Sequence, residues 1–222
     1  MVGLSGRGRE CPCCRAQWRR FAEFNGRSDS LCLRCGALER HRALAVHLRE
    51  ADLPGGDDEI LHFAPEPSIG RLLARSPGGY VSTDLEPGLA MVAADITALP
   101  FEAGRFGLVV CSHVLEHIPD EGAALAELRR VCAAGGRVLV MVPRDPGREE
   151  TDEDPSVTDP EERRRRFLQE DHVRLYGLDL EARLGAAGFD VTTTIPAVEE
   201  GPERALLLGL RSEDEIFSCR PA

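Results

Sequence analysis

Short apolar runs alternate with helix-like segments along the chain from residue 59 onward. The Val-rich run Phe106–Cys111 is typical of a buried strand, and Gly122–Cys132 repeats its leucines at helical spacing. The pattern predicts strands over 59–63, 80–83, 91–94, 106–111, 137–142, 189–194 and 215–219, and helices over 68–74, 122–132 and 178–187. Strands that alternate with helices build a parallel sheet covered on both faces. We therefore predict an α/β fold.

Local signals fix some boundaries of these elements. Ser68 is a candidate N-cap for the first helix of the alternating region. Gly135-Gly136 is expected to end the helix over 122–132 before the next strand begins.

The segment 143–177 interrupts the alternation and is predicted to be a lid or substrate insertion, because a polar stretch this long inside an α/β domain usually has a function. It contains the run Arg163–Arg166, with acidic residues before and after it. Such a run favours a solvated helix face with ion pairs along the helix. The alternative is that one or two arginines bind a carboxylate or phosphate of a substrate.

Cysteines dominate the N-terminal region. Two C-x-x-C pairs, Cys11/Cys14 and Cys32/Cys35, each place two thiolates on one tight turn, and two such turns complete a tetrahedron around Zn²⁺. Four cysteine ligands make a closed, structural site. Cys13 is a spare thiol that could replace Cys14 if the turn is shifted by one residue. The alternative, reduced cysteines in a disordered head, would leave Trp18 and its neighbouring phenylalanines without a core.

The predicted organisation is a zinc module with a linker helix over 1–52, with that helix over 37–50, followed by a larger domain over 53–222. The Pro/Gly-rich break at 52–56 marks the boundary.

Net charge is −11 but is unevenly distributed. Residues 1–50 hold ten arginines and five acidic residues, whereas the remainder holds seventeen arginines and thirty-three acidic residues. The acidic body argues against broad nucleic-acid binding, and the basic head leaves it open as the less favoured alternative. No apolar run approaches the roughly 20 residues of a membrane helix, and the first ten residues lack a secretory core, so a cytoplasmic protein without membrane contact is expected.

Polar residues follow four of the predicted strands, where open α/β sheets bind ligands. They are 62–66, Asp84, Asp95 and 112–117. A carboxylate in the position of Asp84 commonly holds ribose hydroxyls, yet no G-x-G-x-x-G precedes it.

The order of Asp84, 94–101, 106–117, 127–131 and Gly135-Gly136 resembles the class I S-adenosylmethionine-dependent methyltransferases of type 11. The resemblance covers about residues 59–219, and Leu99-Pro100-Phe101 and 114–117 are its most specific parts. The cysteine pairs followed by 38–42 resemble a bacterial subgroup with an N-terminal zinc-ribbon-like module. The resemblance implies a Rossmann-like, seven-stranded, mostly parallel sheet with helices on both faces.

The resemblance also implies residue roles. Asp84 would bind the ribose diol, and Leu85 after it would also be a cofactor-binding residue. Asp95 and Ile96 would contact the adenine, and Ser112 and His113 would line the cofactor and substrate side of the fourth strand. The first loop would hold the methionine end through His62, Phe63, Ala64 and Glu66. This loop lacks the acid and glycines usual in the family, but S-adenosylmethionine has no pyrophosphate to cradle, and Glu66 could face its ammonium and sulfonium.

A nucleophile such as an alcohol or amine also needs a base, and the candidates are His113, His117 and His172. For each histidine the alternative is a hydrogen-bonded structural role. The run 113–117 also matches the H-x-x-E-H pattern of inverted zinc proteases, but Pro119 and the preceding strand argue against the long helix that this site needs.

The expected activity is methyl transfer from S-adenosylmethionine to an O, N or C atom of a small molecule. Two alternatives stay open. One is a ribosomal or transfer RNA methyltransferase that reads RNA with its zinc module, and the other is a non-catalytic binding module that has kept the methyltransferase fold.

Overall fold

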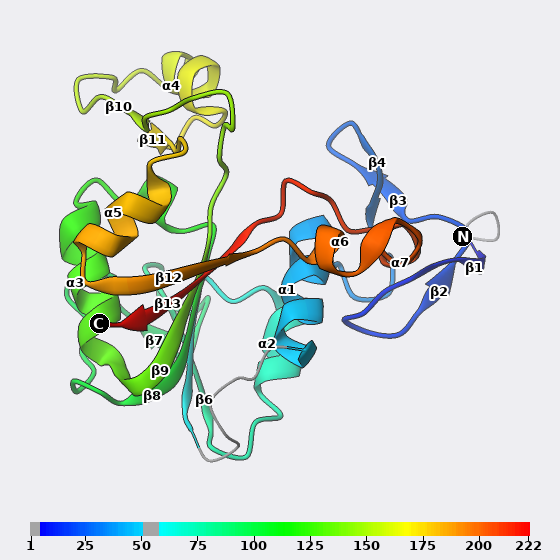
Figure 1. The fold of residues 1–222 in the computed structure, drawn as a ribbon, viewed down its shortest axis with the longest axis horizontal. Helices are drawn as coiled ribbons and strands as arrows, with labels where there is room; N and C mark the ends of the chain where they lie inside the picture. Colours follow the sequence, from blue (N-terminus) through cyan, green and yellow to red (C-terminus); the bar gives the residue numbers. More distant parts are fainter. Residues whose placement is uncertain (1–4, 51–57) are drawn as a thin grey trace.

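The computed structural model describes residues 5–50 and 58–222, which form a seven-stranded sheet with helices on both faces and a small N-terminal module (Figure 1). The strand order is β12-β13-β9-β8-β5-β6-β7. In chain order these strands are β5 (Ile60–Phe63), β6 (Tyr80–Asp84), β7 (Val92–Ala93), β8 (Phe106–Ser112), β9 (Cys132–Met141), β12 (Phe189–Thr194) and β13 (Ile216–Pro221). Within this sheet β13 alone runs opposite to the other strands, antiparallel to both β12 and β9. The predicted α/β fold is confirmed.

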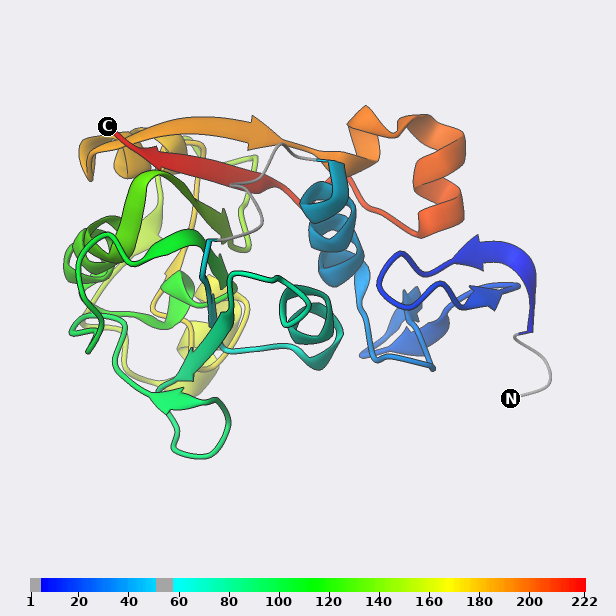
Figure 2. The ribbon, with the colours of Figure 1, turned by 90° about the horizontal axis from the view of Figure 1, so that it is seen from below.

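Two helices cover each face of the sheet (Figures 1 and 2). Helices α1 (Glu39–Glu50) and α2 (Pro67–Leu73) lie on one face, and α3 (Glu121–Val131) and α5 (Leu180–Ala186) on the other. Because successive strand residues point to opposite faces, Leu108 and Val110 of β8 pack in the core beneath α1 and α2, whereas Val109 packs beneath α3 and α5.

Helix α1 is part of the sheet domain as much as of the N-terminal module. Its Leu44 and Ala45 are buried in the same apolar cluster as Ile60, Leu139 and Ile216 of the sheet. The predicted boundary at 52–56 lies outside the described residues. The helix predicted as a linker is therefore one of the layers that cover the sheet.

The N-terminal module contains two antiparallel strand pairs that the apolar pattern did not predict. Strand β1 (Ser5–Glu10) pairs with β2 (Gln17–Trp18), and β3 (Ala22–Phe24) pairs with β4 (Arg27–Leu31). These strands are short and mostly polar, so they carry little alternation.

Helices α6 (Pro196–Glu199) and α7 (Gly201–Leu208), also not predicted, lie beside this module and α1 (Figure 2). Buried Arg42 of α1 joins the three parts. Its guanidinium donates to the Gly209 carbonyl at 2.8 Å and to the Ser30 carbonyl at 2.5 Å, and it stacks on the Phe21 ring at 4.0 Å.

The insertion 143–177 projects from the carboxyl end of the sheet as a small subdomain (Figure 1). It contains β10 (Asp152–Glu153), α4 (Pro160–Phe167) and β11 (Arg174–Leu175), packed around Val157, Phe167 and Leu175. Arg166 pairs with Asp152 at 2.6 Å and with Asp154 at 3.1 Å, and Arg164 pairs with Glu161 and Glu170. These ion pairs agree with the structural interpretation of the arginine run.

Two predicted boundaries were wrong. The N-cap of α2 is Glu66 and not Ser68, because Pro67 occupies the first turn of the helix. Strand β9 begins directly after α3 at Cys132, so Gly135-Gly136 lies within the strand and does not precede it. A Cβ on Gly136 would lie 2.8 Å from the Gly107 carbonyl oxygen, so the glycine permits close approach of β8 and β9.

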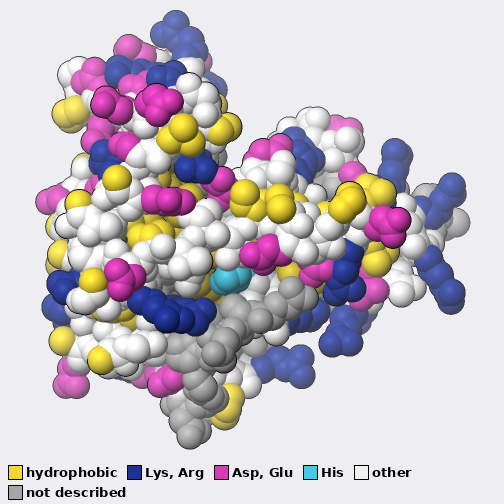
Figure 3. Space-filling model, in the orientation of Figure 1, with side chains coloured by type: hydrophobic (Ala, Val, Ile, Leu, Met, Phe, Trp, Pro, Cys, Tyr) yellow, Lys and Arg dark blue, Asp and Glu magenta, His cyan; other side chains and the backbone are white. Residues whose placement is uncertain are grey.

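Arginine side chains surround the N-terminal module in Figure 3, in agreement with the basic balance of residues 1–50. Within 5–50 and 58–222, none of the helices combines the length and apolar character needed to cross a membrane.

Candidate functional site

One pocket lies at the carboxyl ends of β5, β6, β7 and β8, with a volume of about 460 Å³. Eight of the residues predicted to act at the site line it: Phe63, Ala64, Asp84, Leu85, Asp95, Ile96, His113 and His117. They come from four separate segments that the parallel topology brings to one edge of the sheet.

Asp84 and Asp95 occupy adjacent strand ends. Asp84 closes β6, and its Oδ1 accepts from the Glu86 backbone N–H at 2.9 Å. Asp95 follows β7, and its Oδ1 accepts from the backbone N–H and the hydroxyl of Thr97 at 2.8 and 2.7 Å. These two hydrogen bonds, the backbone one first, hold the pKa of Asp95 below its usual range. Both carboxylates are thus held in place by hydrogen bonds from their own turns.

Two non-glycine residues with left-handed backbones face the pocket. Ala64 has φ 44° directly after β5, and His113 has φ 54° directly after β8. This region costs ordinary residues roughly 1 kcal/mol or more, and residues held there gather at functional sites. The Ala64 N–H donates to the Thr83 carbonyl at 2.9 Å, and the His113 N–H donates to the Met141 carbonyl at 2.7 Å. These two hydrogen bonds hold the turns in place.

His62 and Glu66 of the first loop lie behind the pocket and are not among its lining residues. His62 is fully buried and bonds through Nδ1 to the Tyr80 hydroxyl and through Nε2 to Glu66 Oε2, each at 3.0 Å. The other carboxylate oxygen of Glu66 lies 3.4 Å from Nε2 of His41 on α1. The expectation that Glu66 faces the cofactor therefore changes, because both of its oxygens face histidines.

Burial by itself would raise the pKa of the Glu66 carboxyl, but the hydrogen bonds with His41 and His62 outweigh it and hold the pKa well below its usual range. Burial lowers the pKa of His41, and Glu66 partly offsets this. We conclude that Glu66 is an ionised acceptor that joins helix α1 to the first loop.

Ser112 and His172, two further predicted residues, also lie outside the pocket lining. Ser112 is buried at the end of β8, and its hydroxyl lacks a hydrogen-bond partner among the described residues. His172 is 1% exposed, and its Nδ1 bonds to the Phe167 carbonyl at 2.8 Å. Burial lowers the pKa of His172, and the nearby Glu116 carboxylate partly offsets this.

His113 and His117 are the two candidate bases that reach the pocket. Nδ1 of His113 lies 3.2 Å from Oε1 of Glu116, and Nδ1 of His117 lies 3.2 Å from Oδ2 of Asp171. The two histidines do not share a helix, since His113 is in the left-handed turn and only Leu115–His117 forms a 3-10 turn, η2. The inverted-protease interpretation therefore lacks its required helix.

The four cysteines of the two C-x-x-C pairs converge. Their sulfur atoms lie within 4.8 Å of one another, with Cys11 and Cys35 3.6 Å apart and Cys14 and Cys32 3.7 Å apart. The backbone of each pair closes in the same turn. The Arg15 N–H donates to the Cys11 carbonyl, and the Gly36 N–H donates to the Cys32 carbonyl. The cluster fits a tetrahedral zinc ribbon. Cys13 packs beside the cluster but is not one of its four members, and its thiol donates to the His41 carbonyl.

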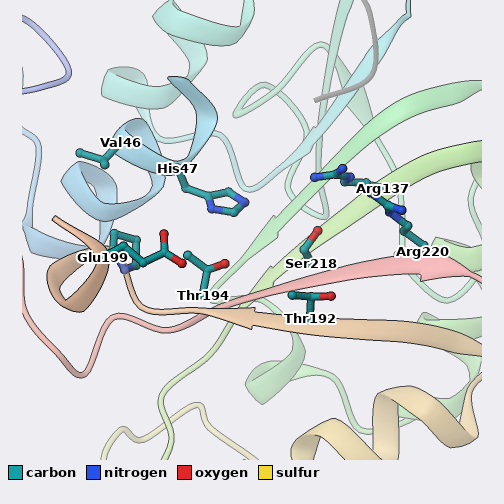
Figure 4. A pocket seen from close by; sticks show the side chains of 9 residues that line it. Val46, His47, Arg137, Thr192, Thr194, Glu199, Ser218 and Arg220 are labelled. Carbon is teal, nitrogen blue, oxygen red and sulfur yellow. The ribbon is translucent and has the colours of Figure 1, made fainter. Parts of the chain in front are cut away.

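A second pocket, between α1 and strands β12 and β13, contains none of the predicted site residues (Figure 4). Its volume is about 250 Å³, and His47, Arg137, Ser218 and Arg220 lie around it. It is polar and lies away from the strand ends at which α/β sheets bind their ligands.

Sequence reasoning missed several lining residues of the first pocket, among them Thr83, Leu89, Val114, Ile118 and Asp171. Thr83 and Val114 adjoin predicted residues and could have been found by extending each strand end. Asp171 comes from the insertion, so only the tertiary structure places it there.

Comparison with known proteins agrees with this geometry. Residues 73–140 match the family model described as a methyltransferase domain. Demethylmenaquinone methyltransferase of Mycolicibacterium vanbaalenii is 33% identical over 102 residues, which cover 41% of this chain and 45% of that protein. The Thermus thermophilus enzyme of the same name is 32% identical over 146 residues, or 54% of this chain and 63% of its own length. The match to the first relative thus spans less than half of its length.

Solved structures resemble the whole sheet domain. A Burkholderia thailandensis 1,6-didemethyltoxoflavin-N1-methyltransferase with bound S-adenosylhomocysteine has a TM-score of 0.54 at 17% identity, covering 82% of this chain and 78% of that chain. A Haemonchus contortus phosphoethanolamine N-methyltransferase 2 in complex with S-adenosyl-L-methionine also scores 0.54, at 18% identity, over 84% of this chain and 53% of its own.

The sheet order, the strand-end pocket and these likenesses define a class I methyltransferase fold. Over residues 73–140 the chain is similar to the methyltransferase-domain family, and an N-terminal zinc-ribbon-like module precedes this fold.

Proposed function

We propose that this protein binds S-adenosylmethionine in the strand-end pocket and transfers its methyl group to a small organic acceptor. The observation that carries the proposal is the convergence of Asp84, Asp95 and Ile96 with the left-handed turns at Ala64 and His113 around one pocket. When bound, the cofactor supplies an activated methyl group on sulfonium, so the protein mainly provides position and proton transfer.

The residues present fit that cofactor. Asp84 has a carboxylate that can accept from two neighbouring ribose hydroxyls, and Asp95 provides an acceptor beside the apolar wall of Ile96, which is 4% exposed. The buried Thr83 hydroxyl lines the same pocket without a partner among the described residues. A buried hydroxyl of this kind is stabilised when a ligand supplies its hydrogen bond.

The surroundings of the pocket favour an apolar or aromatic acceptor. Leu85 and Leu89 line the pocket yet are 68% and 61% exposed, and Met91 nearby in the chain is 66% exposed. Exposed apolar side chains gathered at a pocket commonly mark a binding surface. The relatives named for demethylmenaquinone and tocopherol methylation support an acceptor of this class.

His113 is the best-placed base for an acceptor hydroxyl or amine. It lines the pocket, and Glu116 accepts from its Nδ1, which leaves Nε2 as the proton acceptor. In this proposal the N-terminal cysteines hold one Zn²⁺ that stabilises the module and takes no part in methyl transfer.

Calorimetric titration with S-adenosylhomocysteine tests the proposal. We expect Asp84→Ala to weaken binding roughly tenfold or more, because two hydrogen bonds to a charged acceptor are lost. Asp190→Ala, the same change at an exposed position of β12, is the matched control and should bind like the wild type. Failure of the folded wild type to bind would contradict the proposal and favour a non-catalytic module. Equal binding by the Asp84 variant would contradict the assigned site.

A further inference from the structure

Glu116, His117 and His172 form a second cluster of metal-ligating side chains, separate from the cysteines. One ligand atom from each lies within 4.8 Å of the others. The first two residues come from η2, the turn after β8, and His172 comes from the end of the insertion. The cluster therefore joins two segments more than fifty residues apart in the sequence.

Two atoms of this cluster are buried without a hydrogen-bond partner among the described residues. They are Oε2 of Glu116 and Nε2 of His172, on side chains that are each 1% exposed. A buried, unpaired carboxylate oxygen costs roughly 1 to 3 kcal/mol or more, so such atoms call for an occupant. An ion bound between them would satisfy both.

Each member is also held through its other polar atom. The Phe167 carbonyl accepts from Nδ1 of His172 at 2.8 Å. Oδ2 of Asp171 lies 3.2 Å from Nδ1 of His117, and His113 bonds Oε1 of Glu116 at 3.2 Å. A histidine that ligates a metal usually donates its other ring N–H to a carbonyl or carboxylate, which fixes the free nitrogen toward the ion. Both histidines have such a partner.

The backbone around the cluster is fixed as well. Arg174 is 3% exposed and donates to the carbonyls of Leu115 and Ile118 at 2.8 and 2.6 Å. The Val173 N–H donates to the Glu116 carbonyl at 2.9 Å. These bonds hold the end of the insertion against η2, so the histidine and the carboxylate keep their relative positions.

We propose that Glu116, His117 and His172 bind one divalent transition-metal ion, such as Zn²⁺ or Co²⁺, at the edge of the strand-end pocket. Two imidazoles and one carboxylate are a common ligand set for such ions, with bonds of about 2.0 to 2.2 Å. Ligand atoms around the ion would then lie about 3 to 4 Å apart, so adjustments of under about 1 Å complete the site.

Three protein ligands leave a coordination position open. His117 lines the pocket, so that position is near the space assigned to the acceptor, and the ion would bind and polarise an acceptor oxygen there. Only this last role rests on the proposed function, since metal binding itself needs neither cofactor nor acceptor.

Metal analysis of the full-length protein tests the site. After exchange against Zn²⁺ we expect two equivalents per chain in the wild type and one in Glu116→Gln and in His172→Gln. The second site should lose at least about 100-fold in affinity in each variant. The controls are His47→Gln, a buried histidine of α1 outside the cluster, and Cys13→Ser, and both should keep two equivalents.

Substitution with Co²⁺ separates the two sites. The cysteine cluster gives sulfur charge-transfer absorption, whereas the second site should add only the weaker bands of nitrogen and oxygen ligands, and Glu116→Gln should remove those alone. One equivalent in the wild type, or a second equivalent that survives both substitutions, would overturn the proposal.

Folding and cofactor binding are measured separately. Each variant is checked by its thermal transition and by titration with S-adenosylhomocysteine. If His172→Gln does not fold, Glu116→Gln and His117→Gln decide the result. Loss of the second metal in a variant that keeps the wild-type thermal transition supports the site, whereas a wild type that binds two metals but no cofactor contradicts only the proposed function.

Discussion

At the scale of single residues, Glu66 has the largest effect on how the first loop is interpreted. Its carboxylate lies between His41 on α1 and His62 on β5, behind the strand-end pocket. Ala64, two residues earlier, turns the chain into the pocket with a left-handed backbone. Within the loop Ala64–Glu66, Ala64 lines the strand-end pocket and Glu66 joins helix α1 to the sheet.

Glu66→Gln should make stability less dependent on acid pH. Because folding lowers the pKa of Glu66, its ionised form stabilises the protein fully above the ordinary carboxyl pKa of about 4.3, and this contribution is lost as pH falls through the lower folded pKa. We expect the variant to lose roughly 2 kcal/mol of unfolding free energy at pH 7 and less at pH 3, measured by urea denaturation.

Glu161→Gln is the control for this series, because Glu161 is 73% exposed and pairs only on the surface of α4. It should change the unfolding free energy little at either pH. An equal loss for Glu66→Gln at pH 7 and pH 3 would mean that the carboxylate is not the stabilising species.

At the scale of elements, the close pairing of β8 and β9 sets the position of the η2 turn. Gly107 and Gly136 face each other across the two strands, and the carbonyl of Gly107 leaves no room for a Cβ on Gly136. Strand β8 then ends at Ser112, from which His113 and η2 enter the pocket region. A change in this strand pairing would move the whole turn.

Gly136→Ala should therefore destabilise the protein by about 1 to 3 kcal/mol, because the added methyl group meets the Gly107 carbonyl oxygen at 2.8 Å. Gly185→Ala, at an exposed position of α5, is the matched control, since nothing lies within 4 Å of its added Cβ. Alanine favours helix, so the control should gain up to about 1 kcal/mol. Urea denaturation measures both, and equal stability of the two variants would refute the close-approach explanation.

At the scale of the whole molecule, the zinc-ribbon-like module is attached to the sheet domain by buried polar contacts. Arg42 binds carbonyls of the module and of the segment after α7, and Arg211 lies 2.9 Å from Glu39, which also accepts from Ser30 at 2.6 Å. Modules joined in this way are expected to move as one body and to lose stability together.

Removal of zinc should be visible in the fluorescence of Trp18, the single tryptophan of the chain, which packs in the small core of the module. We expect a strong chelator to shift its emission to longer wavelength, because the four thiolates lose the ion that holds their turns together. Cys32→Ser should give the shifted spectrum without chelator, whereas Cys13→Ser should match the wild type. Unchanged emission after zinc is fully removed would contradict a structural role.

Much of the sheet domain was predictable, because its strands are apolar, short and separated by turn residues. Strand β12 has the predicted bounds, and β5, β6 and β8 differ from theirs by one residue. Because ligands of α/β sheets bind at the carboxyl ends of the strands, Asp84 and Asp95 were expected at one site, and both line one pocket. Helices α6 and α7 were missed, since they are short and their stability depends on packing beside α1 and the N-terminal module.

The sequence by itself determined what depends on neighbouring residues: the alternation of strands and helices, the two cysteine turns and the carboxylates at strand ends. Only the tertiary structure decided which side chains meet across long separations. It turned Glu66 toward His41, and it brought His172 of the insertion to Glu116 and His117. The physical reason is that periodicity and spacing encode local geometry, whereas these contacts depend on packing between elements far apart in the chain.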